Sequence, residues 1–312
     1  MDQLAGGVVL GGRYRLEQPL GRGSMGQVWQ GRDLHLGRAV AVKTVAAELV
    51  TGPEDRAYAL RRFEREARAA AALDHANIAM VHDADITGTT CWLVMQLVDG
   101  ATLDLLLGEC ERMDVAAAAS VAAQLCAGLA AAHAEGLVHR DLKPENVMIR
   151  RDGVLKILDF GLVKLIADSG PRITLPGEQP GNLRYASPEL LAGTPVVDAR
   201  SDLYSVGCLL HHMLAGEPPF PGGNPATLVA AHLGTPPPPL TDYGVEVPAG
   251  LQAVITALLE KDREDRPCSA AEVYGALGPF LPRAEPGEAA MRTFGPEDPR
   301  RPFVLPQAPY PV

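Results

Sequence analysis

Cysteine is scarce in this 312-residue sequence, and no two of its five cysteines are spaced as C-x-x-C. An odd and dispersed set supports neither a disulfide framework nor a zinc site. We therefore expect each thiol to be a buried packing residue in a reducing compartment, and we predict a cytoplasmic protein. The five residues are Cys91, Cys110, Cys126, Cys208 and Cys268.

An excess of positive charge is also absent, since the net charge is −10 and the pI is about 5.3. No run of Lys and Arg residues stands out against this acidic background. The balance argues against nucleic acid or an anionic membrane as the main partner.

Long hydrophobic runs are missing, because no stretch approaches the ~20 uninterrupted apolar residues that a transmembrane helix needs. The nearest is the Ala-rich stretch at residues 115–134, which includes Ser120, Gln124, Gly128 and His133. We expect a buried core helix there and no integral membrane segment. The start, MDQLAGGVVLGG, has no basic residues and only a short apolar run, so no signal peptide is expected.

Two regions of different pattern are present. Residues 13–98 contain short β-type runs separated by glycine-containing turns, with one long helical pattern at residues 54–73. From about residue 102, apolar residues recur at helical spacing, as in Val121, Leu125 and Leu129. This order predicts an α+β fold in which a small, antiparallel β-rich lobe with one long helix precedes a larger helical lobe.

The pattern also sets boundaries. The change near residues 98–101 indicates a hinge, so we place the small lobe at residues 14–98 and the large lobe at residues 99–281. Residues 1–13 form an N-terminal extension. Residues 282–312 are rich in Pro, Gly, Glu and Arg without periodicity, which predicts a disordered tail. A proline-motif ligand is the alternative interpretation of that tail.

The stretch GRGSMGQV at residues 21–28 fits G-x-G-x-x-G-x-V, which can bind a dinucleotide, cover nucleotide phosphates or merely turn the chain. A dinucleotide fingerprint requires a helix after the glycines, and Val28 and Trp29 favour a strand instead. No Gly-Lys-Ser/Thr follows, so a Walker loop is excluded. The remaining interpretation is a glycine-rich hairpin whose amides approach phosphate oxygens.

A lysine and a glutamate follow this hairpin. In the predicted strand AVAVK, Lys43 shares a face with Ala39 and Ala41, so it could extend beneath the loop; a solvated edge lysine is the alternative. Helical spacing places Glu66 on the apolar face with Phe63. A carboxylate there favours a cation, and Lys43 is the natural candidate, although a solvated Glu66 is equally open.

The most informative motif is HRDLKPEN at residues 139–146, followed by DFG at 159–161 and SPE at 187–189. In this order, with the glycine loop, Lys43 and Glu66, the motifs resemble the eukaryotic-type (Hanks-type) protein kinase family. The details resemble bacterial serine/threonine kinases of the PknB type. The resemblance covers about residues 14–280 and implies a bilobal protein-kinase-like fold that uses ATP and Mg²⁺, with Mn²⁺ as an alternative ion.

The resemblance implies a role for each matching residue. Asp141 would accept the substrate hydroxyl proton, Lys143 would lie near the γ-phosphate, and Glu66 would orient Lys43 on the α/β-phosphates. Asn146 and Asp159 would be the metal ligands. The implied nucleotide-binding residues are Leu20, Gly21, Arg22, Gly23, Ser24, Met25, Gly26, Gln27, Val28, Ala41, Lys43, Met95, Gln96 and Val98.

Two further matches are structural in this comparison. Ser201-Asp202 precedes an apolar stripe, so Asp202 is expected to be an N-cap, and in the family this Asp braces the HRD loop. Arg266 would pair with Glu189 of the SPE motif. We expect both to be scaffold residues and not part of the chemistry.

The sequence departs from the family where Asn182 stands in place of the usual threonine. An amide still donates and accepts hydrogen bonds, so we expect an active protein serine/threonine kinase. A pseudokinase or nucleotide-binding scaffold is the alternative, and a kinase acting on a small molecule is disfavoured by the SPE motif.

Regulation and partners follow from the resemblance. Arg140 is expected to bind a phosphate on the activation segment, and Thr174, then Ser169, are the candidate autophosphorylation sites. The expected partners are protein substrates with Ser or Thr acceptors, phosphothreonine-binding proteins and a second copy for trans-autophosphorylation.

Overall fold

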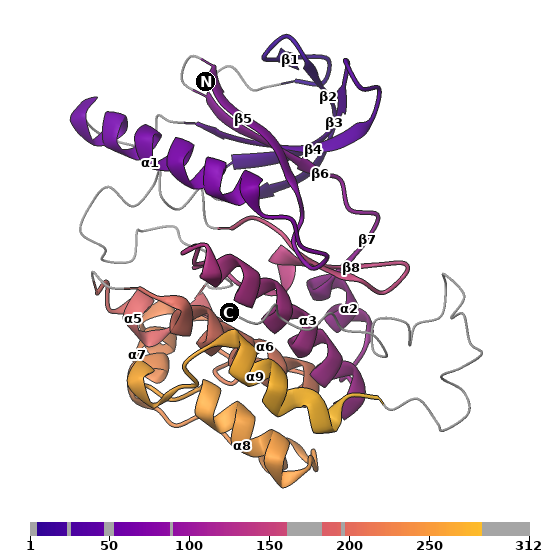
Figure 1. The fold of residues 1–312 in the computed structure, drawn as a ribbon. Coiled ribbons are helices and arrows are strands. Elements are labelled where there is room, and N and C mark those ends of the chain that lie inside the picture. The colour runs from indigo at the N-terminus through magenta and orange to yellow at the C-terminus, as the bar shows by residue number, and fades with distance from the viewer. Residues whose placement is uncertain are drawn as a thin grey trace. The chain divides into compact units, whose positions relative to one another are not determined.

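A computed structural model describes residues 5–23, 26–46, 53–87, 90–160, 183–194 and 197–282 (Figure 1). The chain divides into two compact units, of which the first holds a β-sheet with one long helix and the second is mostly helical. The predicted α+β, kinase-like fold is confirmed. Of the described residues, the first unit comprises those up to Asp74 and Ala79–Val98, and the second comprises His75–Ile78, Asp99–Phe160 and those from residue 183 onward.

The first unit contains an antiparallel six-stranded sheet in the order β1-β2-β3-β4-β6-β5. β1 lies within the residues that the sequence had assigned to an extension. Its elements are β1 (Val9–Leu10), β2 (Tyr14–Gly23), β3 (Gly26–Asp33), β4 (Ala39–Ala46), α1 (Pro53–Ala72), β5 (Val81–Thr87) and β6 (Thr90–Gln96).

Alternation along β4 separates the two faces of this sheet. Val40 and Val42 are fully buried in a core cluster with Trp29 and Val94. Lys43 lies on the opposite face, as the sequence pattern predicted, and is only partly exposed. The apolar cluster therefore fixes the register that turns Lys43 away from it.

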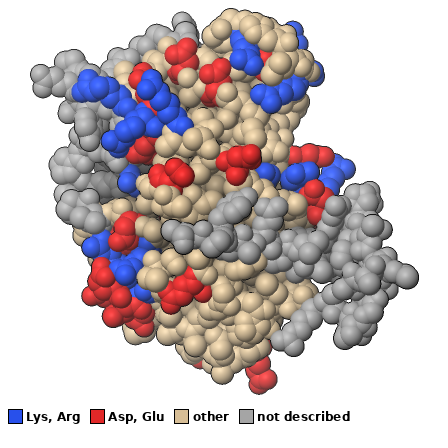
Figure 2. Space-filling model, viewed as in Figure 1, with Lys and Arg blue, Asp and Glu red and all other residues tan. Residues whose placement is uncertain are grey.

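Helix α1 also follows the predicted pattern. Phe63, Ala67 and Ala70 are buried, and Glu66 lies on the same side with 17% of its side chain exposed. The outer side of α1 carries an exposed group of arginines, visible as the blue group over this helix in Figure 2. These are Arg61, Arg65 and Arg68.

The second unit contains a small sheet, β7-β8-β9, and a set of helices. Its strands are β7 (Gly100–Thr102), β8 (Val147–Arg150) and β9 (Leu155–Ile157). Its helices are α2 (Leu103–Glu109), α3 (Val115–Ala134), α5 (Pro188–Leu191), α6 (Ala199–Ala215), α7 (Pro225–Gly234), α8 (Ala249–Leu258) and α9 (Ala270–Leu277). Its 3-10 turns are η2 (Pro144–Asn146), η4 (Leu240–Tyr243), η5 (Arg263–Asp265) and η6 (Gly278–Phe280).

Helix α3 lies at the centre of this unit, in contact with α6, α9 and β9. By length and composition it could cross a membrane, but 72% of its apolar window is buried inside the unit. Its polar residues Ser120 and Gln124 are buried with it and bonded to protein groups. Within the described residues, α3 is therefore a core helix.

The prediction for Asp202 as an N-cap was wrong. Helix α6 begins earlier, at Ala199, and Asp198 caps it by accepting a hydrogen bond from the backbone N–H of Arg200. Asp202 lies in the first turn and its side chain is buried. A side chain already inside the helix cannot cap it, so the carboxylate is available for another partner.

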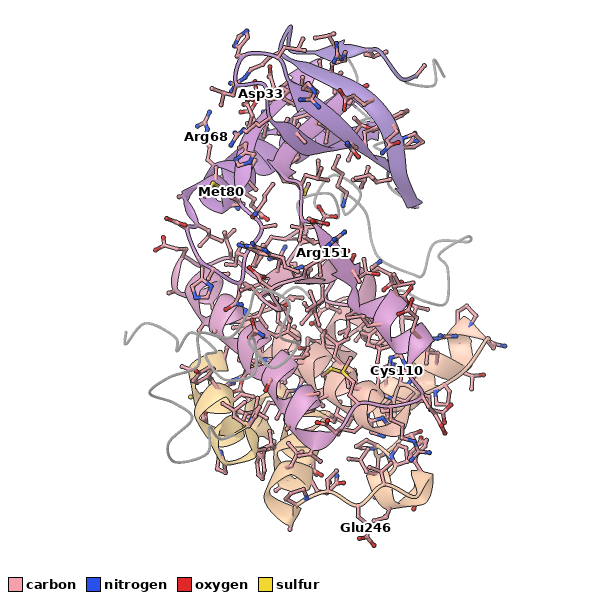
Figure 3. All side chains as sticks on the ribbon, turned by 90° about the vertical axis from the view of Figure 1, so that its right-hand side faces the viewer. Asp33, Arg68, Met80, Cys110, Arg151 and Glu246 are labelled. Atoms are coloured by element: carbon pink, nitrogen blue, oxygen red, sulfur yellow. The ribbon has the colours of Figure 1, made fainter. Side chains whose placement is uncertain are left out.

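Two cysteines also differ from expectation. Cys91, Cys126 and Cys208 are buried, but Cys268 is exposed and Cys110, after α2, is partly exposed (Figure 3). Cys268 precedes α9, where its backbone N–H donates to Glu272.

Candidate active site

The glycine stretch forms the hairpin that the sequence predicted. β2 and β3 are antiparallel, with Gly23 opposite Gly26, and a strand rather than a helix follows. Gly26 has an additional reason to be glycine, because a Cβ there would lie 2.1 Å from the carbonyl oxygen of Thr44. Leu20 and Gly21 are exposed. The hairpin therefore packs closely against β4 at Gly26, next to its tip, while Leu20 and Gly21 on β2 are exposed.

Cross-strand pairing gathers the predicted nucleotide residues of the first unit on one face. Val28 is opposite Lys43, and Ala41 is opposite Met95. Paired residues share a face, as do residues two apart on one strand. Val28, Ala41, Lys43 and Met95 therefore form one surface of the sheet.

The predicted hinge residues lie at the end of β6 and in the loop after it. Gln96 is partly exposed and its N–H donates to the carbonyl of Met80, while Val98 is buried. Arg22 and Gln27 lie opposite each other on β2 and β3. The structure thus places the described nucleotide-binding candidates on β2, β3 and β4, at the end of β6 and in the loop after it.

The HRD loop of the second unit is held by Asp202. Its carboxylate accepts hydrogen bonds from the backbone N–H groups of His139 and Arg140, at 2.8 and 2.9 Å, and contacts Nε2 of His133 at 2.8 Å. Burial alone would raise the pKa of Asp202, but these partners outweigh burial and lower it. The bracing role implied by the resemblance is confirmed as a contact, and it starts from α6.

Three predicted site residues, Asp141, Lys143 and Asn146, contact one another on the loop that Asp202 holds. The amide of Asn146 donates to the backbone carbonyl of Asp141 at 2.7 Å and to its Oδ2 at 3.2 Å. Nζ of Lys143 lies 3.5 Å from the same Oδ2. The side chains of Asp141 and Lys143 are 19% and 16% exposed. A carboxylate held this way can accept a proton from a group that approaches it from solvent.

Asp159 is positioned by β9 and by His139. Nε2 of the buried His139 contacts the carbonyl of Leu158 at 2.7 Å, and its ring lies 5.1 Å from that of Phe160. The HRD loop therefore holds both neighbours of Asp159. Arg140 and Asp159 both adopt positive φ, 63° and 51°, which side chains other than glycine rarely do.

Sequence reasoning missed a buried polar cluster beneath β9. Oε1 of Gln124 accepts from the backbone N–H of Leu155 at 2.9 Å and from the amide of Asn77 at 3.0 Å. Gln124 was noted only as an argument against a membrane helix. A polar side chain inside an Ala-rich stretch was the available signal, because a buried amide requires partners.

The SPE motif is fixed by a buried ion pair. Both carboxylate oxygens of Glu189 accept hydrogen bonds at 2.9 Å from Arg266, and one also accepts from Ser201. Burial would raise the pKa of Glu189, but Arg266 and Ser201 outweigh it and lower the pKa. The predicted Glu189–Arg266 pair is confirmed.

Several predictions fall outside the described residues. These are Ser24, Met25, Ser169, Thr174, Asn182 and the tail after residue 282. The proposed Lys43–Glu66 pair remains a prediction. The carboxylate of Glu66 lies 3.9 Å from the guanidinium of Arg65.

Comparison with known proteins identifies the family. Residues 14–275 match the description "Protein kinase domain". The chain belongs to the protein kinase family. The match spans the glycine hairpin, Lys43, the HRD loop and the SPE motif together.

Three of the most similar curated relatives are bacterial kinases. The chain is 39% identical over 271 residues to a probable serine/threonine-protein kinase of Streptomyces coelicolor, covering 85% of this chain and 39% of that protein. It is 40% identical over 272 residues to PknB of Mycobacterium tuberculosis, covering 86% and 43%, and 38% identical over 279 residues to PknA of the same species, covering 88% and 61%. The chain thus spans about two fifths of the first two relatives and three fifths of the third.

Membership of the protein kinase family implies the use of ATP and a divalent metal ion. The second unit fits a metal ion, because Asn146 and Asp159 offer the oxygen ligands that hard cations prefer. The Asn146 side chain makes two hydrogen bonds to Asp141, and both use its amide nitrogen. Its Oδ1 takes part in no hydrogen bond among the described residues. The orientation of this amide therefore leaves an oxygen for a metal ion.

Proposed function

We propose that this chain is a bacterial protein serine/threonine kinase that transfers the γ-phosphate of ATP to Ser or Thr hydroxyls. The observation that carries the proposal is the Asp141–Lys143–Asn146 group on a loop anchored by Asp202. The names of the bacterial relatives agree with it.

Each residue has a task in this proposal. ATP and Mg²⁺ supply the phosphoryl group and its charge neutralisation, and Mn²⁺ is the alternative ion. Asp141 orients the hydroxyl and takes its proton, and Lys143 stabilises the charge of the transferring group. Asn146 and Asp159 hold the metal ion.

The first unit supplies the nucleotide-binding residues. Lys43 would bind the phosphates and be oriented by Glu66, while Val28 and Ala41 would contact the adenine. Their shared sheet face supports this assignment.

Regulation is part of the proposal. Arg140 would receive a phosphate carried by Thr174 or Ser169 and so order the activation segment. The kinase would act in the cytoplasm, phosphorylate a second copy of itself in trans, and present phosphothreonine to binding proteins.

The test uses purified full-length chain with labelled ATP, Mg²⁺ or Mn²⁺, and a generic protein substrate. Asp141→Asn should abolish label transfer, whereas Asp152→Asn should retain it. Asp152 is a suitable control because it lies in a surface turn, paired with Arg150 at 2.9 Å. Equal background incorporation in wild type and Asp141→Asn would refute the kinase proposal, and phosphopeptide mapping would then test Thr174.

A pseudokinase or nucleotide-binding scaffold is the second candidate, favoured only by Asn182 in place of the usual threonine. It predicts nucleotide binding without transfer. Asn182→Thr separates the two, because a kinase weakened at this position would gain activity and a scaffold would not.

A further inference from the structure

Lysine is rare in this chain, which has five lysines among 28 basic residues. Lys43 and Lys143 belong to the candidate active site, and the buried Lys156 donates to the carbonyl of Ile78 at 3.0 Å. Lys164 lies outside the described residues. Lys261 is the remaining one, and neither the proposed activity nor the family motifs assign it a task.

Lys261 lies in the loop between α8 and η5, over two buried aromatic rings. Its Nζ lies 4.4 Å from the ring centre of Phe220 and 5.7 Å from that of Tyr204, and it donates to the Tyr204 hydroxyl at 3.4 Å. The rings are buried, but Lys261 is partly exposed. The amine is therefore held between an apolar floor and solvent.

The charges around this amine are unusual for a lysine. Among the described residues, no carboxylate lies within ion-pair distance of it. The nearby guanidinium of Arg266 is 4.9 Å from the same Tyr204 ring. Aromatic faces attract a cation, yet they do not replace the carboxylate that usually keeps a lysine charged.

We propose that Lys261 is a site of lysine acylation by acyl phosphates and acyl thioesters. The neutral amine attacks the acyl carbon, a C–N bond forms, and the C–O or C–S bond to the leaving group breaks. Phosphate or thiolate departs with the electron pair, and the proton lost from nitrogen passes to water. The product is a neutral amide.

The surroundings favour this step because acylation requires an unprotonated nitrogen. Burial is the largest influence and lowers the pKa of Lys261 to about 8; Arg266 acts in the same direction, whereas Cys208 and Glu260 act against it without cancelling the shift. At pH 8 about half of such an amine is neutral, against roughly 0.3% for an ordinary lysine. A weaker base is also a weaker nucleophile, which offsets part of the gain and leaves roughly a tenfold advantage.

Acylation would disturb a connected cluster. The Tyr204 hydroxyl, which receives a bond from Lys261, lies 2.9 Å from Nδ1 of the buried His232, whose ring contacts Phe220 edge-on. Phe220 packs with Leu183, just before the SPE motif. A neutral amide would remove the charge over these rings, so the modification would loosen the support of that segment.

The test treats the full chain with acetyl phosphate at several pH values and quantifies each acetylated lysine by mass spectrometry. Lys261 should acetylate about tenfold faster than Lys143 and Lys156 at pH 8, with a rate midpoint near pH 8. Lys143 is an internal control, because it is similarly sheltered but lies 3.5 Å from a carboxylate. A Lys261 rate that equals the controls and still rises at pH 10 would overturn the proposal.

A second variant tests whether burial against the aromatic rings, and not solvent exposure alone, sets the acetylation rate of Lys261. Phe220→Ala opens the apolar floor to water and so relieves the burial that lowers the pKa of Lys261; it should slow Lys261 acetylation several-fold and move its midpoint to higher pH, with circular dichroism confirming the fold. Lys261→Arg cannot be acetylated and should lose the modified peptide while retaining the thermal midpoint. An unchanged midpoint in a folded Phe220→Ala variant would contradict the proposed role of burial against this ring.

Discussion

Asp202 joins three parts of the second unit through one side chain. Its two oxygens meet the N–H groups of His139 and Arg140 and the ring of His133. The resemblance indicated that Asp202 contacts the HRD loop. It did not indicate the contact with His133, which lies 69 residues from Asp202 in the sequence. Such a partner depends on the packing of α3 against α6, which local pattern does not reveal.

Replacing Asp202 should affect activity through position. Asp202→Asn turns one acceptor into a donor that faces backbone N–H groups, so Asp141 would shift and kinase activity should fall about 100-fold. Steady-state measurements of phosphate transfer would quantify this loss of activity. Asp198→Asn is the matched control, because Asn caps a helix as well as Asp does. Full activity in a folded Asp202→Asn variant would show that the anchor is dispensable.

The Glu189–Arg266 pair should determine stability. Glu189→Ala leaves a buried guanidinium without its charge partner, which costs about 3–5 kcal/mol of unfolding free energy. The double variant Glu189→Leu with Arg266→Met should lose less than the sum of the single variants. Urea denaturation measures these values, and a loss below about 1 kcal/mol for Glu189→Ala would contradict the assignment.

At the scale of elements, the sequence predicted the long helices closely. α1 was expected at residues 54–73 and occupies Pro53–Ala72, and α3 matches residues 115–134. α1 has a marked helical periodicity, whereas α3 was recognised as a long Ala-rich apolar run that is buried on all sides. The start of α6 was missed because Ser201-Asp202 also reads as a cap, and only the structure shows that Asp198 makes that bond.

The close contact between α3 and β9 requires a residue without a side chain at Gly128. A Cβ on Gly128 would lie 2.9 Å from Cδ1 of Ile157 and 3.2 Å from Asn77. Gly128→Val should therefore destabilise the protein by about 1–3 kcal/mol through overpacking. The midpoint of thermal or urea unfolding reports this loss.

Gly275 in α9 provides the control, because nothing lies within 4 Å of its added Cβ. Gly275→Ala should stabilise the helix by about 0.5–1 kcal/mol. If both substitutions stabilised the protein, the close approach of α3 to β9 would not be required.

The whole molecule should lose stability in mild acid. Burial lowers the pKa of His212 and of His232 to about 4. The hydroxyl of Tyr204 forms a hydrogen bond with Nδ1 of the neutral His232 ring. An unfolded histidine binds its proton near pH 6.5, so between pH 6.5 and 4 the unfolded state takes up more protons than the folded state. Stability is complete above this range and falls as pH decreases through it.

Urea titrations from pH 8 to 4.5 measure the effect, which is at most about 1.4 kcal/mol per pH unit for each histidine. His232→Gln should flatten the slope because Gln does not titrate. His35→Gln, on an exposed turn, should leave it unchanged. A slope unaffected by His232→Gln would exclude this source of acid sensitivity.

Arg140 and Asp159 set a limit on how far this molecule can be stabilised. Each holds a side chain at positive φ, at a cost of about 1–2 kcal/mol that glycine would avoid. A selection for heat tolerance alone would favour glycine at both positions, and would thereby discard a proposed metal ligand and a proposed phosphate receptor. The most thermostable descendants of this chain and its most active ones would be different proteins.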